Sequence, residues 1–289
     1  MTLALLFPGQ GTQHIGMGKD LFPAFPDLTE LAEEILGHSL RRLCLDDPDG
    51  VLGHTRFTQP AVYTVSALAH RRRLLDGAAP ADVLLGHSLG EYNALEAAGV
   101  VDFATGLRLV AERARLMDTT VGGMIAVSGI DADRLAETLR LLAAPGLHIA
   151  VLNTPRQVVL AGPEEVLRQA TPTLRDAGAR AVTPLQVSGP FHTPWMSRAA
   201  EEFATVLMAV PHWHEPAAPV IANHTARPHE IPRIVTDLTR QIDHPVLWTS
   251  SVDRVLDADP DTTFTEVGGT TTLLPLVRQI RRRRLAARP

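Results

Sequence analysis

Short apolar runs alternate along this chain with longer amphipathic segments, and glycine- and proline-rich turns separate them. The runs at 3–7 and 83–85 are typical of strands that are buried on both faces of a parallel sheet. Apolar residues at helical spacing cover 62–75, 103–117 and 273–284. This alternation of strand and helix patterns predicts an α/β fold.

The segment 121–188 has a different texture, and we expect it to form a unit of its own. Its expected strands are 124–127, 148–152, 157–161 and 181–187, and its expected helices are 131–142 and 164–177. The order β-α-β-β-α-β is that of a ferredoxin-like unit. We therefore expect a large α/β-hydrolase-like domain with a parallel sheet, residues 1–120 and 189–289, and an inserted small ferredoxin-like subdomain, residues 121–188. The groove between the two would hold the functional site.

Residues 86–90 read Gly-His-Ser-Leu-Gly and directly follow the second apolar run. Where a strand turns sharply into a helix, a Gly-x-Ser-x-Gly pattern exposes the serine at the tip, and the helix N-terminus favours negative charge beside it. The same pattern also occurs in ordinary turns. Here a strand pattern precedes it and a helix pattern follows it, so Ser88 is the candidate nucleophile for attack on a carbonyl carbon.

A serine nucleophile needs a base, and the chain offers 12 histidines. His87 is the neighbour of Ser88, but adjacent side chains on such a turn point in different directions. His192 follows a Gly-Pro turn where the small unit rejoins the large one, so it is expected to face the groove and is the candidate base. The pairs 212/214 and 224/229 lack the partners of a metal site, and we expect no bound metal.

Composition excludes several classes of function. A chain of 289 residues with 45% hydrophobic residues can bury one large core and an insertion. The net charge of −5 argues against nucleic acid as a partner. The single cysteine, Cys44, leaves no disulfide within the chain, and no signal peptide or membrane-spanning run is expected. We therefore expect a cytoplasmic protein.

Arginines gather at 41–42, 71–73 and 281–284. Such clusters are common at solvated helix ends, where cations complement the helix dipole. They could equally form a docking surface for an acidic protein partner. The sequence leaves both interpretations open.

The first apolar run is followed by a glycine-rich turn at 8–13, and a helix is expected after Met17. A strand, a glycine-rich turn and a helix together suggest phosphate binding, but the Gly-Lys-Ser/Thr ending of a P-loop is absent. The turn can instead present Gln10 to a site formed by neighbouring strand ends.

Several further motifs occur in order along nearly the whole chain. They are 7–13 (FPGQGTQ), 58–61 (TQPA), 86–91 (GHSLGE), Arg113-x-x-x-Met117, 153–159 (NTPRQVV), 188–192 (SGPFH) and 266–268 (EVG). This set closely resembles the malonyl-CoA:acyl carrier protein transacylase family. The contexts of 46–48 and 57–60 are most similar to the discrete acyltransferases that serve polyketide synthases in trans.

The resemblance implies a role for each matching residue. Ser88 would take the acyl group, and His192 would act as general base and then as general acid. The backbone N–H groups of Gln10 and Leu89 would form the oxyanion hole. A backbone carbonyl near Leu247 would orient His192.

The substrate-binding residues are also implied by the resemblance. Arg113 would hold the free carboxylate of a malonyl group through a bidentate pair. Gln59, His87 and Asn153 would line the same site. Phe191, a bulky residue beside His192, would favour malonyl over α-methylated malonyl, although one methyl group changes the binding free energy by only about 1–3 kcal/mol.

The implied reaction is ping-pong transfer from malonyl-CoA, through an ester on Ser88, to the phosphopantetheine thiol of an acyl carrier protein or a carrier domain of a polyketide synthase. No bound cofactor is implied, since malonyl-CoA is a substrate and the phosphopantetheine arrives on the carrier. A monomer is expected, with no membrane partner. The alternatives are a malonyl transacylase of fatty-acid synthesis, an editing hydrolase of acyl carrier proteins, a non-catalytic docking subunit, or the same chemistry on a substituted malonyl group.

Overall fold

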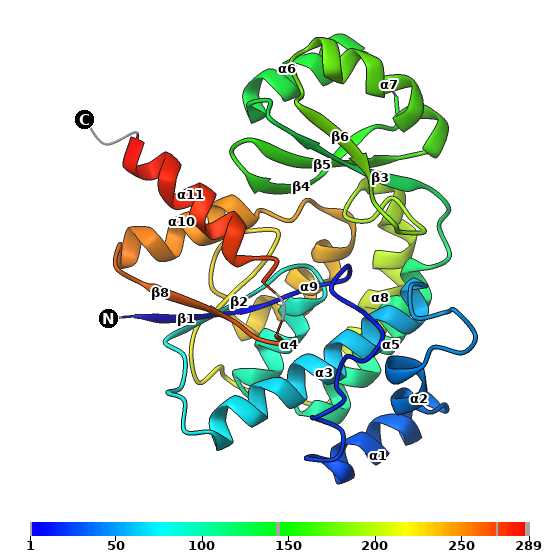
Figure 1. The fold of residues 1–289 in the computed structure, drawn as a ribbon, viewed down its shortest axis with the longest axis vertical. Helices are drawn as coiled ribbons and strands as arrows, with labels where there is room; N and C mark the ends of the chain where they lie inside the picture. Colours follow the sequence, from blue (N-terminus) through cyan, green and yellow to red (C-terminus); the bar gives the residue numbers. More distant parts are fainter. Residues whose placement is uncertain (1, 143–144, 270, 287–289) are drawn as a thin grey trace.

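The computed structural model describes residues 2–142, 145–269 and 271–286, and it contains two separate four-stranded sheets. Figure 1 shows the antiparallel sheet with its two helices at one end of the molecule, and the parallel sheet with the remaining helices at the other. The α/β character predicted from the sequence is confirmed.

The parallel sheet has the strand order β7-β2-β1-β8. Its strands are β1 (Leu3–Phe7), β2 (Val83–Gly86), β7 (Val220–Ile221) and β8 (Thr263–Glu266). The two central strands, β1 and β2, are almost wholly buried, as expected for a sheet covered on both faces. The turns that follow them, which carry Gln10 and Ser88, therefore leave the same edge of the sheet side by side.

Helices surround this sheet and supply most of the large core. They are α1 (Pro26–Leu36), α2 (Leu40–Leu45), α3 (Thr55–Leu75), α4 (Gly90–Ala97), α5 (Phe103–Met117), α8 (Ser197–Met208), α9 (Ile234–Asp243), α10 (Trp248–Ala258) and α11 (Leu274–Ala286), with short 3₁₀ helices at Pro194–Met196 and Ile231–Arg233. The helix expected after Met17 is wrong. Gly16 and Gly18 have positive φ angles, so this segment forms turns and the first helix begins at Pro26.

The antiparallel sheet has the strand order β4-β5-β3-β6. Its elements are β3 (Gly123–Ser128), α6 (Ala132–Leu142), β4 (His148–Thr154), β5 (Gln157–Gly162), α7 (Glu164–Asp176) and β6 (Ala181–Pro184). The order β-α-β-β-α-β is the predicted one, although β6 ends three residues before the expected 187.

Strand β4 connects the antiparallel sheet to the loop between α9 and α10. The backbone N–H of Leu152 donates to the carbonyl of Val246 at 2.9 Å, and the N–H of Val246 donates to the carbonyl of Ala150 at 2.9 Å. One face of the antiparallel sheet packs on its own helices, α6 and α7, and forms a separate core. On the other face, Val151 and Val159 belong to the large core, which also contains Phe191 from the segment after β6. A site between the sheets therefore has walls from both parts. No helix of the described residues has the length and apolarity needed to cross a bilayer.

Candidate active site

Ser88 lies at the tip of a sharp turn between β2 and α4. Its φ angle of +53° is in the left-handed region, which is unfavourable for any residue other than glycine. A Cβ atom at Gly86 would lie 2.0 Å from the backbone of Gly90, and a Cβ atom at Gly90 would lie 2.0 Å from the carbonyl oxygen of Phe7. Both glycines are thus required for the chain to double back and expose Ser88.

The predicted base lies against this serine. The distance between Nε2 of His192 and Oγ of Ser88 is 2.7 Å, and Nδ1 of His192 lies 2.7 Å from the carbonyl oxygen of Gln241. Because that carbonyl can only accept, Nδ1 carries the proton and Nε2 is free to accept one from Ser88. Burial, together with the nearby Arg113 cation, lowers the pKa of His192 to about 3. The ring is therefore neutral at physiological pH and competent as a base.

The expectation that a carbonyl near Leu247 orients the base is wrong. The Leu247 carbonyl accepts hydrogen bonds from the N–H and the Oγ of Ser251, both at 2.9 Å, because it closes the first turn of α10. The orienting carbonyl comes from Gln241, near the end of α9.

Arg113 projects from α5 into the site and is only 1% exposed. Its guanidinium donates to Oγ of Ser88 at 3.1 Å, to Oε1 of Gln59 at 2.6 Å and to Oε1 of Gln241 at 3.0 Å. Burial lowers its pKa below the ordinary value, yet a guanidinium stays protonated in proteins. Among the described residues no carboxylate forms an ion pair with Arg113, so a buried cation faces the nucleophile without an anionic partner.

Two backbone N–H groups beside Ser88 are also without partners. Among the residues that the structure describes, the amides of Gln10 and Leu89 have no hydrogen-bond acceptor. Gly9 lets the two turns approach, because a Cβ atom there would lie 2.5 Å from the carbonyl oxygen of His87. The side-chain amide of Gln10 is held separately, 3.1 Å from Oγ1 of Thr55.

His87, Asn153 and Phe191, three further predicted residues, line the same site as Ser88. Nε2 of His87 lies 2.9 Å from Oδ1 of Asn153, which anchors the small sheet to the serine turn. Burial lowers the pKa of His87, so its ring is neutral. Phe191 is buried beside the base. One cavity of about 220 Å³ is lined by several apolar side chains and by all nine predicted site residues. These nine are Gln10, Gln59, His87, Ser88, Leu89, Arg113, Asn153, Phe191 and His192.

The sequence interpretation missed two residues that hold this arrangement. Oδ1 of Asn223 accepts the N–H of Ser88 at 2.7 Å, and its Nδ2 donates to the carbonyl of Gly86 at 2.7 Å. The side chain of Gln241 donates to the carbonyl of Ser88 at 2.7 Å while its own carbonyl holds His192. Neither residue lies in a motif, and only tertiary structure brings them to the serine.

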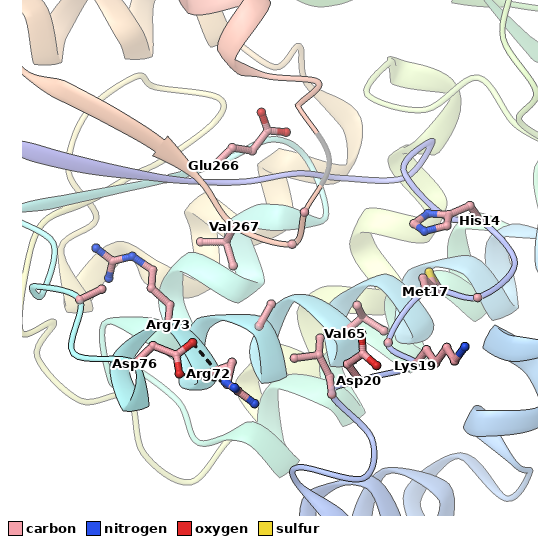
Figure 2. Close-up of a pocket in the computed structure, with 17 residues that line it drawn as sticks. His14, Met17, Lys19, Asp20, Val65, Arg72, Arg73, Asp76, Glu266 and Val267 are labelled. Carbon is pink, nitrogen blue, oxygen red and sulfur yellow. Dashed lines mark hydrogen bonds and ion pairs between the residues drawn. The ribbon is translucent and has the colours of Figure 1, made fainter.

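A larger cavity, of about 640 Å³, lies elsewhere, between the turns at 14–21, the C-terminal half of α3 and the loop after β8. Figure 2 shows that both basic and acidic side chains line this cavity. The basic ones are Lys19, Arg72 and Arg73, and the acidic ones are Asp20, Asp76 and Glu266. Its lining contains no serine or cysteine, so size does not identify the reactive site. The described residues also contain no cluster of three or more His, Cys, Asp or Glu side chains suited to a metal.

Most of the arginine clusters are engaged in local contacts. Arg41 pairs with Glu33, Arg72 with Asp76, and Arg284 with Asp253. Arg281 donates to the carbonyl of Thr262, and its guanidinium lies 5.2 Å from the ring centre of Phe264. Within the cluster 281–284, this leaves Arg282 and Arg283 as exposed cations.

Comparison with known proteins identifies the family. Residues 4–283 match the model of the acyl transferase domain. The chain belongs to the acyl transferase family. Among its relatives, the polyketide biosynthesis malonyl CoA-acyl carrier protein transacylase BaeC of Bacillus velezensis is 44% identical over 96% of both chains. The polyketide biosynthesis protein ThaF of Burkholderia thailandensis is 45% identical over 96% of this chain, which spans only 24% of the length of ThaF.

A solved structure of a relative has the same fold as this chain. The malonyl CoA-acyl carrier protein transacylase of Burkholderia pseudomallei matches with a TM-score of 0.94 and 41% identity, covering 100% of this chain and 99% of that one. The family resemblance found in the sequence motifs is therefore confirmed. The roles of individual residues rest on the geometry described above.

Proposed function

We propose that this acyltransferase moves a malonyl group from malonyl-CoA to the phosphopantetheine thiol of an acyl carrier protein. One observation carries the choice of acyl group. Arg113 is a buried cation without a carboxylate partner among the described residues, and its Nη2 lies 3.1 Å from the nucleophilic oxygen. An acyl group with its own carboxylate supplies the missing anion, and the planar guanidinium binds a carboxylate through two hydrogen bonds.

In the first half-reaction, Nε2 of His192 accepts the proton of Ser88 while Oγ attacks the thioester carbonyl carbon. The negative charge that develops on the carbonyl oxygen is stabilised by the free N–H groups of Gln10 and Leu89, and one such donor lowers the barrier by about 3 kcal/mol. The carbon–sulfur bond then breaks, and His192 returns its proton to the sulfur of CoA. The malonyl group remains as an ester on Ser88.

The second half-reaction runs through the same groups. His192 accepts the proton of the phosphopantetheine thiol, and the sulfur attacks the ester carbonyl. The bond to Oγ of Ser88 breaks, and the oxygen recovers the proton from His192. Arg113 holds the malonyl carboxylate during both steps, which keeps the ester in one position until the thiol arrives.

The preferred pathway is polyketide synthesis, with extender units loaded in trans. The names of BaeC and ThaF support this assignment, because both proteins are described as acting in polyketide biosynthesis. A role in fatty-acid synthesis uses the same chemistry and is distinguished by which carrier accepts malonate. The hydrolase alternative is disfavoured because an enzyme that removes simple acyl chains does not need the Arg113 cation.

The proposal includes the organisation of the protein. Residues 121–188 are proposed as a small subdomain inserted between 1–120 and 189–289, supported by the separate core of the antiparallel sheet. A cytoplasmic monomer is proposed as the working form. The single cysteine, Cys44, is buried and unpaired, as is usual in a reducing compartment.

A transfer experiment tests the function. The protein is incubated with radiolabelled malonyl-CoA, separated from free label, and then mixed with a phosphopantetheinylated carrier protein. We expect label on the enzyme that moves to the carrier, and no label on Ser88→Ala. Rapid release of free malonate before the carrier is added would instead support the hydrolase. Carriers from a polyketide synthase and from fatty-acid synthesis, compared at equal concentration, separate the two pathways.

A further inference from the structure

A row of buried ionisable groups lies directly behind the nucleophile, and none of them takes part in the proton transfers described above. Nε2 of His229 lies 2.6 Å from Oε1 of Glu91, and Nδ1 of His229 lies 3.6 Å from Oδ2 of Asp237. All three side chains are at most 4% exposed. Buried charges are expensive unless they are paired, so an imidazolium between two carboxylates is the stable arrangement. Consistently, the two carboxylates raise the pKa of His229 to about 9 in spite of burial.

The second oxygen of Glu91 faces the active site. Oε2 accepts a hydrogen bond from Nε2 of Gln241 at 2.9 Å and from the backbone N–H of Asn223 at 3.1 Å. These two residues hold the backbone of Ser88 on both sides. Asn223 accepts a hydrogen bond from the Ser88 N–H, and Gln241 donates one to the Ser88 carbonyl, each at 2.7 Å. Glu91 therefore binds both Asn223 and Gln241, the two residues that keep Ser88 in its left-handed backbone conformation.

Glu91 also helps to fix which way the Gln241 amide points. The Glu91 carboxylate and the Ser88 carbonyl can both only accept, so together they fix the NH₂ group of Gln241 toward themselves and leave Oε1 facing Arg113. Oε1 indeed lies 3.0 Å from Nη2 and 3.3 Å from Nε of Arg113. With the amide reversed, the NH₂ group would face a guanidinium, which has no acceptor. An ionised Glu91 therefore supports the amide orientation that gives Arg113 its acceptor on Gln241.

We propose that Glu91 and His229 form a buried ion pair that acts as a positioning unit for acyl transfer, setting the Gln241 amide and, through it, Ser88, His192 and Arg113. Other charged groups face this pair from neighbouring elements. Asp237 on α9 contacts His229, and it is in turn contacted by Nε2 of His224 at 3.1 Å and by Nη2 of Arg233 at 3.7 Å. His229 is thus enclosed by carboxylates, whereas Asp237 also faces the guanidinium of Arg233.

Two assays test the positioning role of Glu91 and His229. One rests on the proposed function, and the other does not depend on it. The first measures single-turnover acylation by malonyl-CoA and by acetyl-CoA. The second measures the rate at which a fluorophosphonate probe labels Ser88, which reports nucleophile and base without needing a malonyl group. If the unmodified protein transfers no malonate but is labelled by the probe, the proposed function fails while the positioning role can still be tested.

Glu91→Gln is the primary variant. We expect at least a tenfold fall in both the malonyl acylation rate and the probe labelling rate, because the neutral amide no longer pairs with the His229 cation and can donate where the carboxylate only accepted. The preference for malonyl over acetyl should fall as well, since Arg113 loses its fixed acceptor. A circular dichroism spectrum equal to that of the unmodified protein shows that the variant is folded. His244→Gln is the matched control, because His244 also contacts a carboxylate, Oδ1 of Asp243 at 2.5 Å, but forms no ion pair with Glu91; it should change both rates less than twofold.

A pH profile and a double variant separate positioning from a general loss of stability. Above about pH 9 His229 loses its proton and leaves Glu91 and Asp237 as buried carboxylates without their shared cation, so labelling of the unmodified protein should decline there. This decline should be absent in His229→Gln. The double variant Glu91→Gln, His229→Gln should be no slower than Glu91→Gln, because the pair acts as one unit. If Glu91→Gln does not fold, His229→Gln alone is read by the same two assays. Rates and selectivity within twofold of the unmodified protein in a folded Glu91→Gln or His229→Gln would overturn the proposal.

Discussion

The guanidinium of Arg113 donates a hydrogen bond of 3.1 Å to Oγ of Ser88. The same guanidinium is held by the side-chain amides of Gln59 and Gln241, both neutral. A buried cation in contact with a nucleophilic hydroxyl has two effects. It adds to the effect of burial in lowering the pKa of the neighbouring base, His192, and it offers an unpaired positive charge to an incoming acyl group.

Replacing Arg113 should alter the choice of acyl group more than the chemistry. We expect Arg113→Ala to lower kcat/KM for malonyl-CoA by about 100-fold, since hydrogen bonds to a charged group contribute roughly 1.5–3 kcal/mol. The value for acetyl-CoA should change only a few-fold, because acetate carries no second carboxylate. Steady-state rates with both thioesters measure the difference. Arg113→Lys is the control that keeps the charge and removes the planar fork; equal losses on both substrates in Arg113→Ala would rule out the carboxylate-binding role.

The acylation rate should be insensitive to mild acid. An ordinary histidine is half protonated at pH 6.5, whereas His192 has a pKa of about 3 in the folded protein and stays neutral. Single-turnover acylation should therefore be flat from about pH 8 to about pH 5. A loss of rate with a midpoint between 6 and 7 would show that the base titrates normally and contradict the buried geometry.

The same lowered pKa predicts how stability depends on pH. Below pH 6.5 the unfolded chain binds a proton at residue 192 that the folded protein does not bind, so the free energy of unfolding falls as pH falls. His70, whose pKa burial lowers to about 4, acts in the same direction. Urea unfolding at pH 7.5 and 5.5 measures the slope. His192→Gln should make it shallower, and an unchanged slope in that variant would contradict the assignment.

Asn223 should matter for both folding and acylation. Asn223→Ala removes the acceptor for the Ser88 N–H and the donor to Gly86, and one unsatisfied buried group destabilises by about 1–3 kcal/mol. We expect a lower free energy of unfolding and slower acylation of Ser88. Asn223→Asp serves as the comparison, because its carboxylate can still accept the Ser88 N–H but cannot donate to Gly86. It should recover part of the acylation rate; no difference between the two variants would show that the contact to Ser88 is unimportant.

Docking of the carrier protein can be tested on α11. Within the described cluster 281–284, Arg281 and Arg284 are engaged in contacts within the chain, which leaves Arg282 and Arg283 exposed. If this cluster contacts an acidic carrier, Arg282→Glu combined with Arg283→Glu should raise KM for the carrier several-fold and leave acylation by malonyl-CoA unchanged. An unchanged KM would assign these residues to ordinary solvated surface.

Local sequence patterns predicted the parts of the site that lie in short motifs. Ser88 was found from the two glycines that its turn requires, and His192 from its position at the junction of the two sheets. Both inferences depend on residues close together in the chain. The order of elements in 121–188 was likewise visible in the spacing of apolar residues, and the strand order of the small sheet follows from it.

The orienting carbonyl could not be predicted in the same way. Every residue has a backbone carbonyl, so no residue type marks the one that faces His192. The choice between Gln241 and Leu247 is made by where α9 ends and α10 begins, since a carbonyl used inside a helix is not available. Gln241 and Asn223 lie 153 and 135 residues from Ser88 in the chain, and no local pattern connects them to it.

The nucleophile and the base share one backbone property. Ser88 and His192 both have positive φ angles, +53° and +61°, although neither is glycine. Each such conformation costs of order 1 kcal/mol or more, and it persists only because the surrounding contacts impose it. Stability and catalysis therefore make opposite demands at these two positions. Selection for heat resistance alone would favour glycine at both and would discard the two side chains that react.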